Sequence, residues 1–236
     1  MAESLLVGDI HADLSNLNPI YGLKDTAKVS LAEAVAAVGI DGLEGAVFLA
    51  LQFAAQNPDD LLDGDEVGSL NFYTMETPFY PAFNRALGSK NRPEAKPFFK
   101  FLRLALGAMH KLELVRGLFA RGIKNPSLAN YYDGRAPFFW WAFSSTTKKV
   151  GVTKQFLGDG PRMLFMIDGT GVDISPYSAI PEAEVIVLPG SRFRLQGCVL
   201  EAGGGLSIAT LQQVPSPPML DFAHPGIAAA LGSGGA

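Results

Sequence analysis

Apolar positions follow a helical spacing in the first half of the chain. Ser30 is a typical helix N-cap, and Glu33 stands three residues later, as in a capping box. The apolar residues that follow predict two amphipathic helices with a bend at residues 39–42, ending at the turn formers 57–60. Further helices are expected over residues 65–73, 78–87 and 97–112, the last with a broad apolar stripe.

The second half of the chain has a pattern typical of strands, in which short β-branched and aromatic runs alternate with Gly, Pro and Asp turns. Strands are expected over residues 112–119, 138–143, 163–167, 172–174, 184–188, 193–200 and 206–212, with a short helix over 149–156. Three consecutive glycines at 203–205 predict a hairpin turn between the last two strands. Helices first and strands second indicate an α+β fold rather than alternating βαβ units.

The amino-acid composition excludes some classes of function and some kinds of site. The 236 residues are 48% hydrophobic and 18% charged, so the chain can bury a sizeable core in one large domain or two small ones. A net charge of −4 argues against a general nucleic-acid binder, which needs a basic surface. Cys198 is the single cysteine, which excludes an intrachain disulfide and a cysteine metal cluster. The sequence contains no GxGxxG, GxxxxGK[ST] or GxSxG motif.

Neither a membrane segment nor a metal site is expected. The first six residues lack a basic n-region, and the apolar stretch 45–55 is too short to span a bilayer. The three histidines (His11, His110 and His224) are far apart and have no metal-ligand spacing. We therefore expect a soluble protein, located in the cytoplasm or exported by a route that needs no signal peptide.

Three polar features interrupt the predicted strands, and each also has a purely structural interpretation. Arg116 lies within the apolar run 114–119, where it could hold a phosphate or carboxylate, or point into solvent from an edge strand. The hydroxyl run 144–147 follows an aromatic strand and could orient a ligand, or cap a helix. Glu182 and Glu184 lie on the same face of one strand, where two carboxylates are either used or simply solvated.

These features occur in the order arginine, Phe-x-Ser-Thr-Thr and Glu-x-Glu, with 29 residues from Arg116 to Ser145 and 39 from Ser145 to Glu184. In this the chain resembles the mono-ADP-ribosyltransferases of the Arg-Ser-Glu type, which include cholera-like and C2-like toxins and vertebrate ecto-transferases. Other segments share the resemblance, which covers roughly residues 65–214. They are Asn71–Thr74 with Tyr80 and Asn84, Met163–Ile167, Gly171–Ser178, and Leu188–Phe193.

The resemblance implies a mixed, mainly antiparallel two-sheet β core around an NAD cleft, and transfer of ADP-ribose from NAD with release of nicotinamide. NAD would be the donor substrate, and no metal would take part. Glu184 would stabilise the positive charge that develops on the ribose, and Ser145 would orient Glu184 and the ligand. Arg116 would hold the diphosphate, and the backbone of Gly117 would lie near the nicotinamide amide.

Further contacts are implied with the same donor. Phe156 would stack on the nicotinamide, unless it is a core residue of the helix after the hydroxyl run. The side chains of Tyr80 and Asn84 would line the phosphate side, Thr146 would belong to the NAD-binding hydroxyl motif, and Arg162 would be a second diphosphate contact. Glu182 would pair with a guanidinium, because Glu-x-Glu goes with arginine acceptors in this family.

The expected organisation is an N-terminal helical segment (1–60), a catalytic domain (61–214) and a loose tail (215–236). The expected partner is a target protein with an accessible arginine. Two alternatives stay open: an NAD glycohydrolase, in which water replaces the acceptor, and a catalytically silent module of the same fold that serves in interactions.

Overall fold

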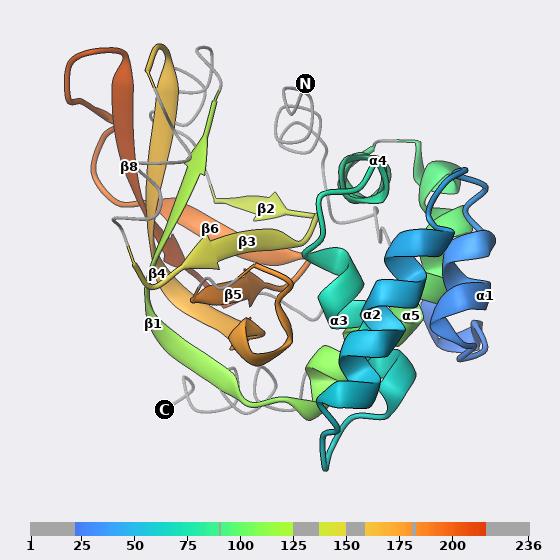
Figure 1. Ribbon diagram of the computed structural model, residues 1–236. Coiled ribbons are helices and arrows are strands. Elements are labelled where there is room, and N and C mark those ends of the chain that lie inside the picture. Colours follow the sequence, from blue (N-terminus) through green and yellow to red (C-terminus); the bar gives the residue numbers. More distant parts are fainter. Residues whose placement is uncertain (1–21, 90, 125–136, 150–158, 181–182, 216–236) are drawn as a thin grey trace, which may run out of the picture.

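The structure is a computed structural model that describes residues 22–89, 91–124, 137–149, 159–180 and 183–215. Helices occupy the first part of the described chain and strands the second, as predicted, and the two parts pack side by side (Figure 1). The expected helix over 149–156 falls mostly, and the tail from 216 entirely, outside these residues, as do Phe156 and Glu182. The proposed domain boundaries stay a prediction.

The helices lie close to their predicted positions. They are α1 (Leu31–Ala36), α2 (Glu44–Gln56), α3 (Gly64–Tyr73), α4 (Phe79–Gly88) and α5 (Phe99–Lys111), with the 3-10 turns η2 (Leu23–Asp25) and η3 (Arg92–Phe98). The Oγ atom of Ser30 accepts the Glu33 N–H at 3.2 Å and caps α1 as expected. Gly39 and Gly42, in the predicted bend, have φ angles of 71° and 79°, which an L side chain rarely adopts.

The described strands form one hydrogen-bonded, eight-stranded sheet of order β1-β3-β5-β4-β8-β6-β2, in which β7 pairs with β8. Their bounds are β1 (Leu114–Ile123), β2 (Phe138–Trp140), β3 (Ser144–Thr147), β4 (Arg162–Asp173), β5 (Glu184–Val187), β6 (Ser191–Leu195), β7 (Leu200–Glu201) and β8 (Leu206–Gln213); the 3-10 turn η4 (Ser175–Tyr177) precedes β5. Every pair is antiparallel except β4–β8. The α+β, mainly antiparallel prediction is confirmed, but hydrogen bonds join the strands into one network instead of two sheets, because β4 pairs with β1 and β5 and also with β8.

Two predicted strands, 163–167 and 172–174, are one long strand, β4. The glycines between them read as a turn in the sequence, but they let neighbouring strands come close. A Cβ on Gly171 would lie 2.6 Å from Val185 Cγ1 and 2.8 Å from the Ile186 carbonyl oxygen. Gly171 therefore allows β5, the strand that begins with Glu184, to cross tightly over β4. Conversely, the predicted strand 193–200 is divided between β6 and β7, and the predicted strand 138–143 ends at Trp140.

Two apolar clusters hold the fold together. The larger one lies between the helices and the sheet, where Phe143, Val172 and Ile186 join the aromatic side chains of α3, α4 and α5. The smaller one lies within the sheet and contains Trp140 and Phe193, whose ring centroids are 4.7 Å apart. The sheet thus buries side chains on both faces, and the helical part is not an independent appendage.

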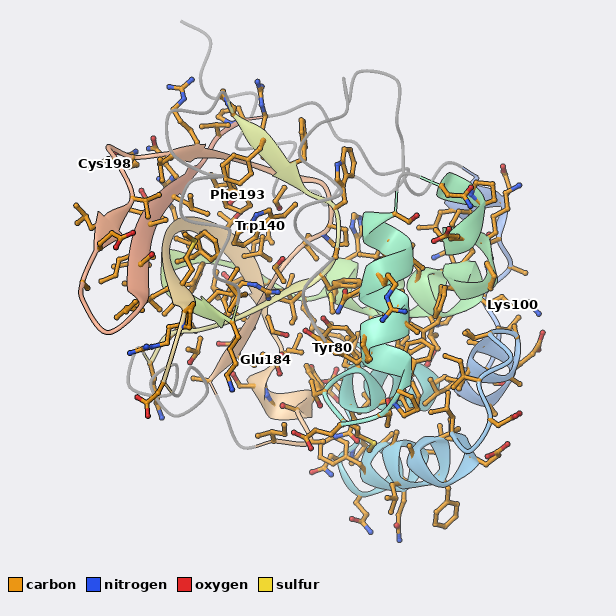
Figure 2. All side chains as sticks on the ribbon, turned by 90° about the horizontal axis from the view of Figure 1, so that it is seen from above. Tyr80, Lys100, Trp140, Glu184, Phe193 and Cys198 are labelled. Carbon is orange, nitrogen blue, oxygen red and sulfur yellow. The ribbon has the colours of Figure 1, made fainter. Side chains whose placement is uncertain are left out.

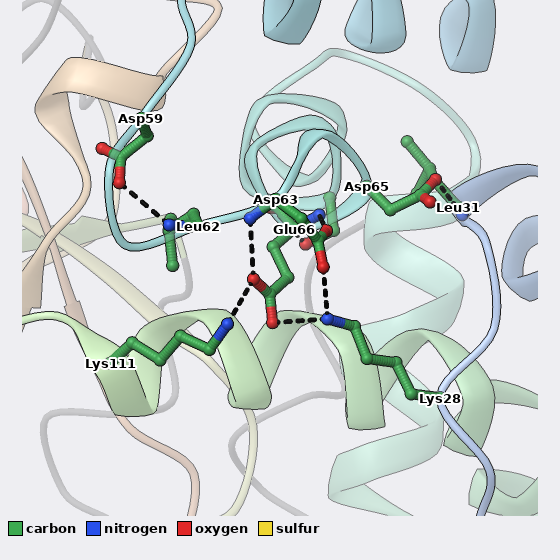
Figure 3. A network of polar contacts seen from close by, with 9 residues as sticks. Lys28, Leu31, Asp59, Leu62, Asp63, Asp65, Glu66 and Lys111 are labelled. Carbon is green, nitrogen blue, oxygen red and sulfur yellow. Dashed lines mark hydrogen bonds and ion pairs between the residues drawn. The ribbon is translucent and has the colours of Figure 1, made fainter.

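A buried carboxylate joins the start of α3 to its neighbours (Figure 3). Glu66 is 2% exposed and accepts hydrogen bonds from the Nζ atoms of Lys28 and Lys111, each at 2.7 Å. Asp63 and Glu66 also form a complete capping box. Burial opposes ionisation of Glu66, but the hydrogen bonds from Lys111, Lys28 and the Asp63 N–H outweigh it and hold the pKa of Glu66 below its ordinary value.

Among the described helices, none is both long and apolar enough to cross a membrane. Within the same residues, no three His, Cys, Asp or Glu side chains are grouped so as to hold a metal ion.

Candidate active site

The centre of the candidate site is a serine–glutamate pair on adjacent strands. β3 and β5 are antiparallel, with Ser145 opposite Ile186 and Thr147 opposite Glu184. Side chains at these positions share one face of the sheet, and the Ser145 hydroxyl donates to Glu184 Oε1 at 2.6 Å. The Ser178 hydroxyl donates to Glu184 Oε2 at 3.3 Å. Both carboxylate oxygens therefore have a hydroxyl donor, which fixes the orientation of the charge.

Helices α3 and α4 supply the side of the site that faces this pair. The ring of Tyr73 packs against Tyr80 and against Phe143, with centroids 5.4 Å apart in each case. Asn84 is 2% exposed and lies one turn after Tyr80 on α4. Figure 2 shows Glu184 and Tyr80 where the sheet meets the helical part. The predicted pair Tyr80 and Asn84 is thus brought to the Ser145–Glu184 pair through Tyr73.

Two buried polar atoms lie at this place, the Tyr73 hydroxyl and Asn84 Oδ1. Neither makes a hydrogen bond of good geometry within the described residues, although the side chains of Asn84 and Ser145 lie near the Tyr73 hydroxyl. Burial raises the pKa of Tyr73 well above its ordinary value, and the nearby Tyr80 and Glu184 act in the same direction. The hydroxyl consequently stays protonated and available as a donor. Buried polar atoms are rarely left unpaired, so two together beside a fixed carboxylate indicate a place for a polar ligand.

The hydroxyl run 144–147 is a strand, β3, and not the helix cap that was its structural alternative. Because side chains alternate along a strand, Thr146 points to the opposite face from Ser145. Its hydroxyl is buried and donates to the Val185 carbonyl at 2.7 Å, which ties β3 to β5. The structure therefore does not bring Thr146 to the cluster.

Arg116 lies on β1 opposite Thr170, and its side chain is exposed. It shares a face of the sheet with Ala120, whose partner on β3 is Thr147. Through β4, Arg116 is closer to the pair, because Leu114, two residues before Arg116, lies opposite Val172, and Val172 lies opposite Ile186, the partner of Ser145. Gly117 is adjacent and lies opposite Gly169. Arg116 and Gly117 therefore lie on a strand next to those that carry Ser145 and Glu184, and their contacts with a ligand stay a prediction.

Two other arginines, Arg121 and Arg162, make contacts that the sequence did not predict. Arg121, which the sequence analysis missed, donates to the Ser145 carbonyl at 2.9 Å and lies 5.7 Å from the centre of the Trp140 ring. A second Arg-Gly pair in the same strand was the signal for it. Arg162 donates to the carbonyl oxygens of Gly160 and Gly204 next to the start of β4, and its role as a second diphosphate contact stays a prediction.

Tyr73 and Ser178 were also missed as site residues, although both stand in segments that carry the family resemblance. Glu182 and Phe156 lie outside the described residues, and their predicted roles remain predictions. The cluster around Ser145 and Glu184 can stabilise positive charge on a bound molecule, because it presents a fixed carboxylate beside neutral hydroxyl and amide groups.

Comparisons of the whole fold agree with this site. The sequence matches no protein-family model and no curated protein. The structure, however, is similar to the eukaryotic mono-ADP-ribosyltransferase ART2.2, with a TM-score of 0.58 and 20% identity over 89% of this chain and 92% of the other. The chain has the ADP-ribosyltransferase fold.

Two bacterial proteins share the ADP-ribosyltransferase fold with it. One is Vis from Vibrio splendidus, solved in complex with agmatine (TM-score 0.57, 19% identity, 86% of this chain and 94% of the other). The second is HopU1 from Pseudomonas syringae (TM-score 0.55, 20% identity, 80% and 90%). The similarity spans helices and sheet alike, so the helical part belongs to this fold and is not an unrelated addition.

Proposed function

We propose that the protein is a mono-ADP-ribosyltransferase that takes ADP-ribose from NAD, releases nicotinamide and modifies an arginine side chain of a target protein. The observation that carries the proposal is the Ser145–Glu184 hydrogen bond of 2.6 Å, set beside the unpaired buried atoms of Tyr73 and Asn84. It occurs in a chain with the ADP-ribosyltransferase fold, at the positions that the sequence resemblance selected.

The reaction explains why a fixed carboxylate is needed. The bond between the ribose C1′ and the nicotinamide nitrogen breaks, and its electron pair leaves with nicotinamide, so positive charge develops on the ribose. Glu184 stabilises that charge more in the transition state than in the ground state. Ser145 and Ser178 hold both carboxylate oxygens, so little reorganisation is needed when the charge appears.

The other site residues act on different parts of the donor, NAD. Arg116, exposed on β1, binds the diphosphate, and the Gly117 backbone lies near the nicotinamide amide. Asn84 and Tyr80 line the phosphate side, and Phe156 stacks on the nicotinamide ring. Thr146 supports the site indirectly, because its hydroxyl bonds the Val185 carbonyl.

The proposal of arginine as the acceptor rests on Glu182. A carboxylate beside the incoming guanidinium can pair with it and take up the proton that is released when the nitrogen bonds to C1′. That Vis has been solved with agmatine, which carries a guanidinium group, supports an arginine-like acceptor for this fold.

Nicotinamide release, measured with and without agmatine, tests both parts of the proposal. We expect agmatine to accelerate release and to be recovered as its ADP-ribosylated product. Glu182→Gln should lower transfer to agmatine by about a hundredfold, a cost of about 2.7 kcal/mol, and retain part of the hydrolysis of NAD. Equal loss of both activities would remove Glu182 from the acceptor side. Release that agmatine does not alter would indicate a glycohydrolase or a different acceptor.

Arg116→Ala tests the diphosphate contact. A hydrogen-bonded charge contributes about 1.5–3 kcal/mol, so we expect the KM for NAD to rise roughly tenfold or more. Arg194→Ala is the matched control, because Arg194 is an exposed arginine on β6 that has no place in the site. An unchanged KM in Arg116→Ala would remove Arg116 from the diphosphate role.

A further inference from the structure

The turn between β4 and β5 is bound to the helical part of the protein by three hydrogen bonds. The Tyr177 hydroxyl donates to Asp59 Oδ2 at 2.7 Å, and Asn71 Nδ2 donates to the Tyr177 carbonyl at 2.9 Å. The Ala179 N–H donates to Thr74 Oγ1 at 2.7 Å. The partners are 118, 106 and 105 positions apart in the sequence. The position of this turn is thus set by helix α3 and by the segment before it.

The same turn carries Ser178, the donor to the second oxygen of Glu184. The Ile180 N–H donates to Ser178 Oγ at 3.2 Å, so that oxygen already accepts one bond and directs its own proton to Glu184. Ser145 reaches the other oxygen from β3. The carboxylate is therefore held from two sides: from the sheet by Ser145, and from the helical part through the turn by Ser178.

Asp59 is arranged to serve this contact. Its Oδ1 accepts the N–H groups of Leu61 and Leu62 at 2.7 and 3.0 Å, which leaves Oδ2 for Tyr177. The Tyr177 hydroxyl and the Leu61 N–H lower the pKa of Asp59. Burial, together with the bond to Asp59, raises the pKa of Tyr177, so its hydroxyl remains a donor at neutral pH. Residue 59 precedes the stretch that resembles known transferases.

We infer that Asp59 and Tyr177 are positioning residues for Glu184, acting through Ser178. Their hydrogen bond fixes the turn, the turn fixes the Ser178 hydroxyl, and the hydroxyl prevents the carboxylate from rotating away from the developing charge. The inference rests on the proposed function, in which Glu184 stabilises the ribose. Without the Ser178 hydroxyl, the carboxylate turns more freely about its last side-chain bond, and misorientation by even a small angle weakens such stabilisation.

Tyr177→Phe is the sharpest variant, because it removes one oxygen atom and keeps the packed ring. We expect kcat for nicotinamide release to fall about tenfold, the effect of one lost hydrogen bond, with the KM for NAD unchanged within about twofold. The acidic limb of the kcat pH profile should move to higher pH, since a carboxylate that loses a donor is protonated more easily. Asp59→Asn keeps an oxygen for Leu61 and Leu62 but not the charge, and should change kcat in the same direction.

A double variant separates positioning from general destabilisation. If Tyr177 acts through Ser178, Tyr177→Phe should lower kcat by no more than about twofold in a Ser178→Ala background. The matched control is Ser69→Ala, which removes a buried hydroxyl from α3 whose bond goes only to the Glu66 carbonyl. It should leave kcat and the pH profile unchanged. Multiplicative effects of the two site variants would overturn the inference.

A measurement without NAD distinguishes failure of the inference from failure of the proposed function. The titration of the Glu184 carboxyl carbon, followed by NMR and assigned with Glu184→Gln, should shift to higher pH in Tyr177→Phe and in Ser178→Ala, but not in Ser69→Ala. The titratable groups near Glu184 in the described structure are Tyr73, which stays protonated over that range, Tyr80, and Asp173 with its partner Lys148 beside β5. The signal of the Asp173 carboxyl is therefore assigned separately with Asp173→Asn. A shifted midpoint in a protein that releases no nicotinamide would end the proposed function and keep the positioning. Unchanged midpoint and kcat in folded Tyr177→Phe would end the positioning.

Discussion

Glu184→Gln is expected to reduce nicotinamide release from NAD by about a thousandfold or more while the protein stays folded. The amide is neutral, so it cannot stabilise the positive charge on the ribose, and loss of one such electrostatic contact typically costs a factor of 10²–10³ or greater. Its oxygen can still accept the Ser145 hydroxyl, which occupies Glu184 Oε1 in the native protein. The melting temperature should therefore change by only about 2 °C.

The matched control for this variant is Glu201→Gln, the same change at an exposed position on β7. It should retain full activity and stability. The comparison needs a steady-state assay of both variants and a thermal melt. Full activity in Glu184→Gln would refute the assignment of the active site, and the thermal melt shows whether a loss of activity comes from loss of the folded state.

Glu66→Gln is expected to have the largest effect on stability. The native carboxylate is 2% exposed and holds Lys28 and Lys111 together with the start of α3. A neutral amide cannot accept from two ammonium groups and the Asp63 N–H, and each hydrogen bond to a charged group contributes about 1.5–3 kcal/mol, so we expect a loss of about 3 kcal/mol. For a chain of this size that corresponds to a fall in melting temperature of roughly 6–12 °C.

Glu33→Gln provides the comparison, because Glu33 pairs with Lys100 where both side chains are largely in water, 55% and 39% exposed. Such pairs contribute less than about 1 kcal/mol. The pH dependence gives a second check. The pKa of Glu66 is lowered in the folded protein, so its contribution to stability is present above the ordinary glutamate pKa of about 4.3 and is lost as the pH falls through the folded value. Wild-type protein should lose more stability than Glu66→Gln on acidification below about pH 4.5.

The helices were predictable because their signals are local. Ser30 as a cap, the glycine bend at 39–42 and the apolar stripe of α5 all act within a few residues of sequence. The strands were located, but their order was not, because pairing depends on partners that are distant in sequence. Gly169 and Gly171 show the difficulty: the same residue type marks a turn in one context and a close approach of strands in another.

Some residues of the candidate site could likewise be predicted from the sequence, and others could not. Ser145 and Glu184 were found through the order of short motifs, and the structure brings them within 2.6 Å. Tyr73 was not distinguished as a site residue, because a buried aromatic residue on a helix looks like any other core residue until its hydroxyl is seen without a partner. Asp59 could not be found from sequence at all, since its role exists only through a contact across 118 positions.

The pairing of β1 with β3, of β3 with β5, of β5 with β4 and of β4 with β1 forms a closed ring of four strands. Within the described sheet, the edge strands β2 and β7 are short, with three and two residues, but β1 has ten residues and pairs with β3 only at Ala120, so most of one side of β1 is open. Long open edges are where sheets recruit strands from other molecules and aggregate. In the described sheet, the open side of β1, the strand that carries Arg116, is therefore the place that a partner adding a strand would extend.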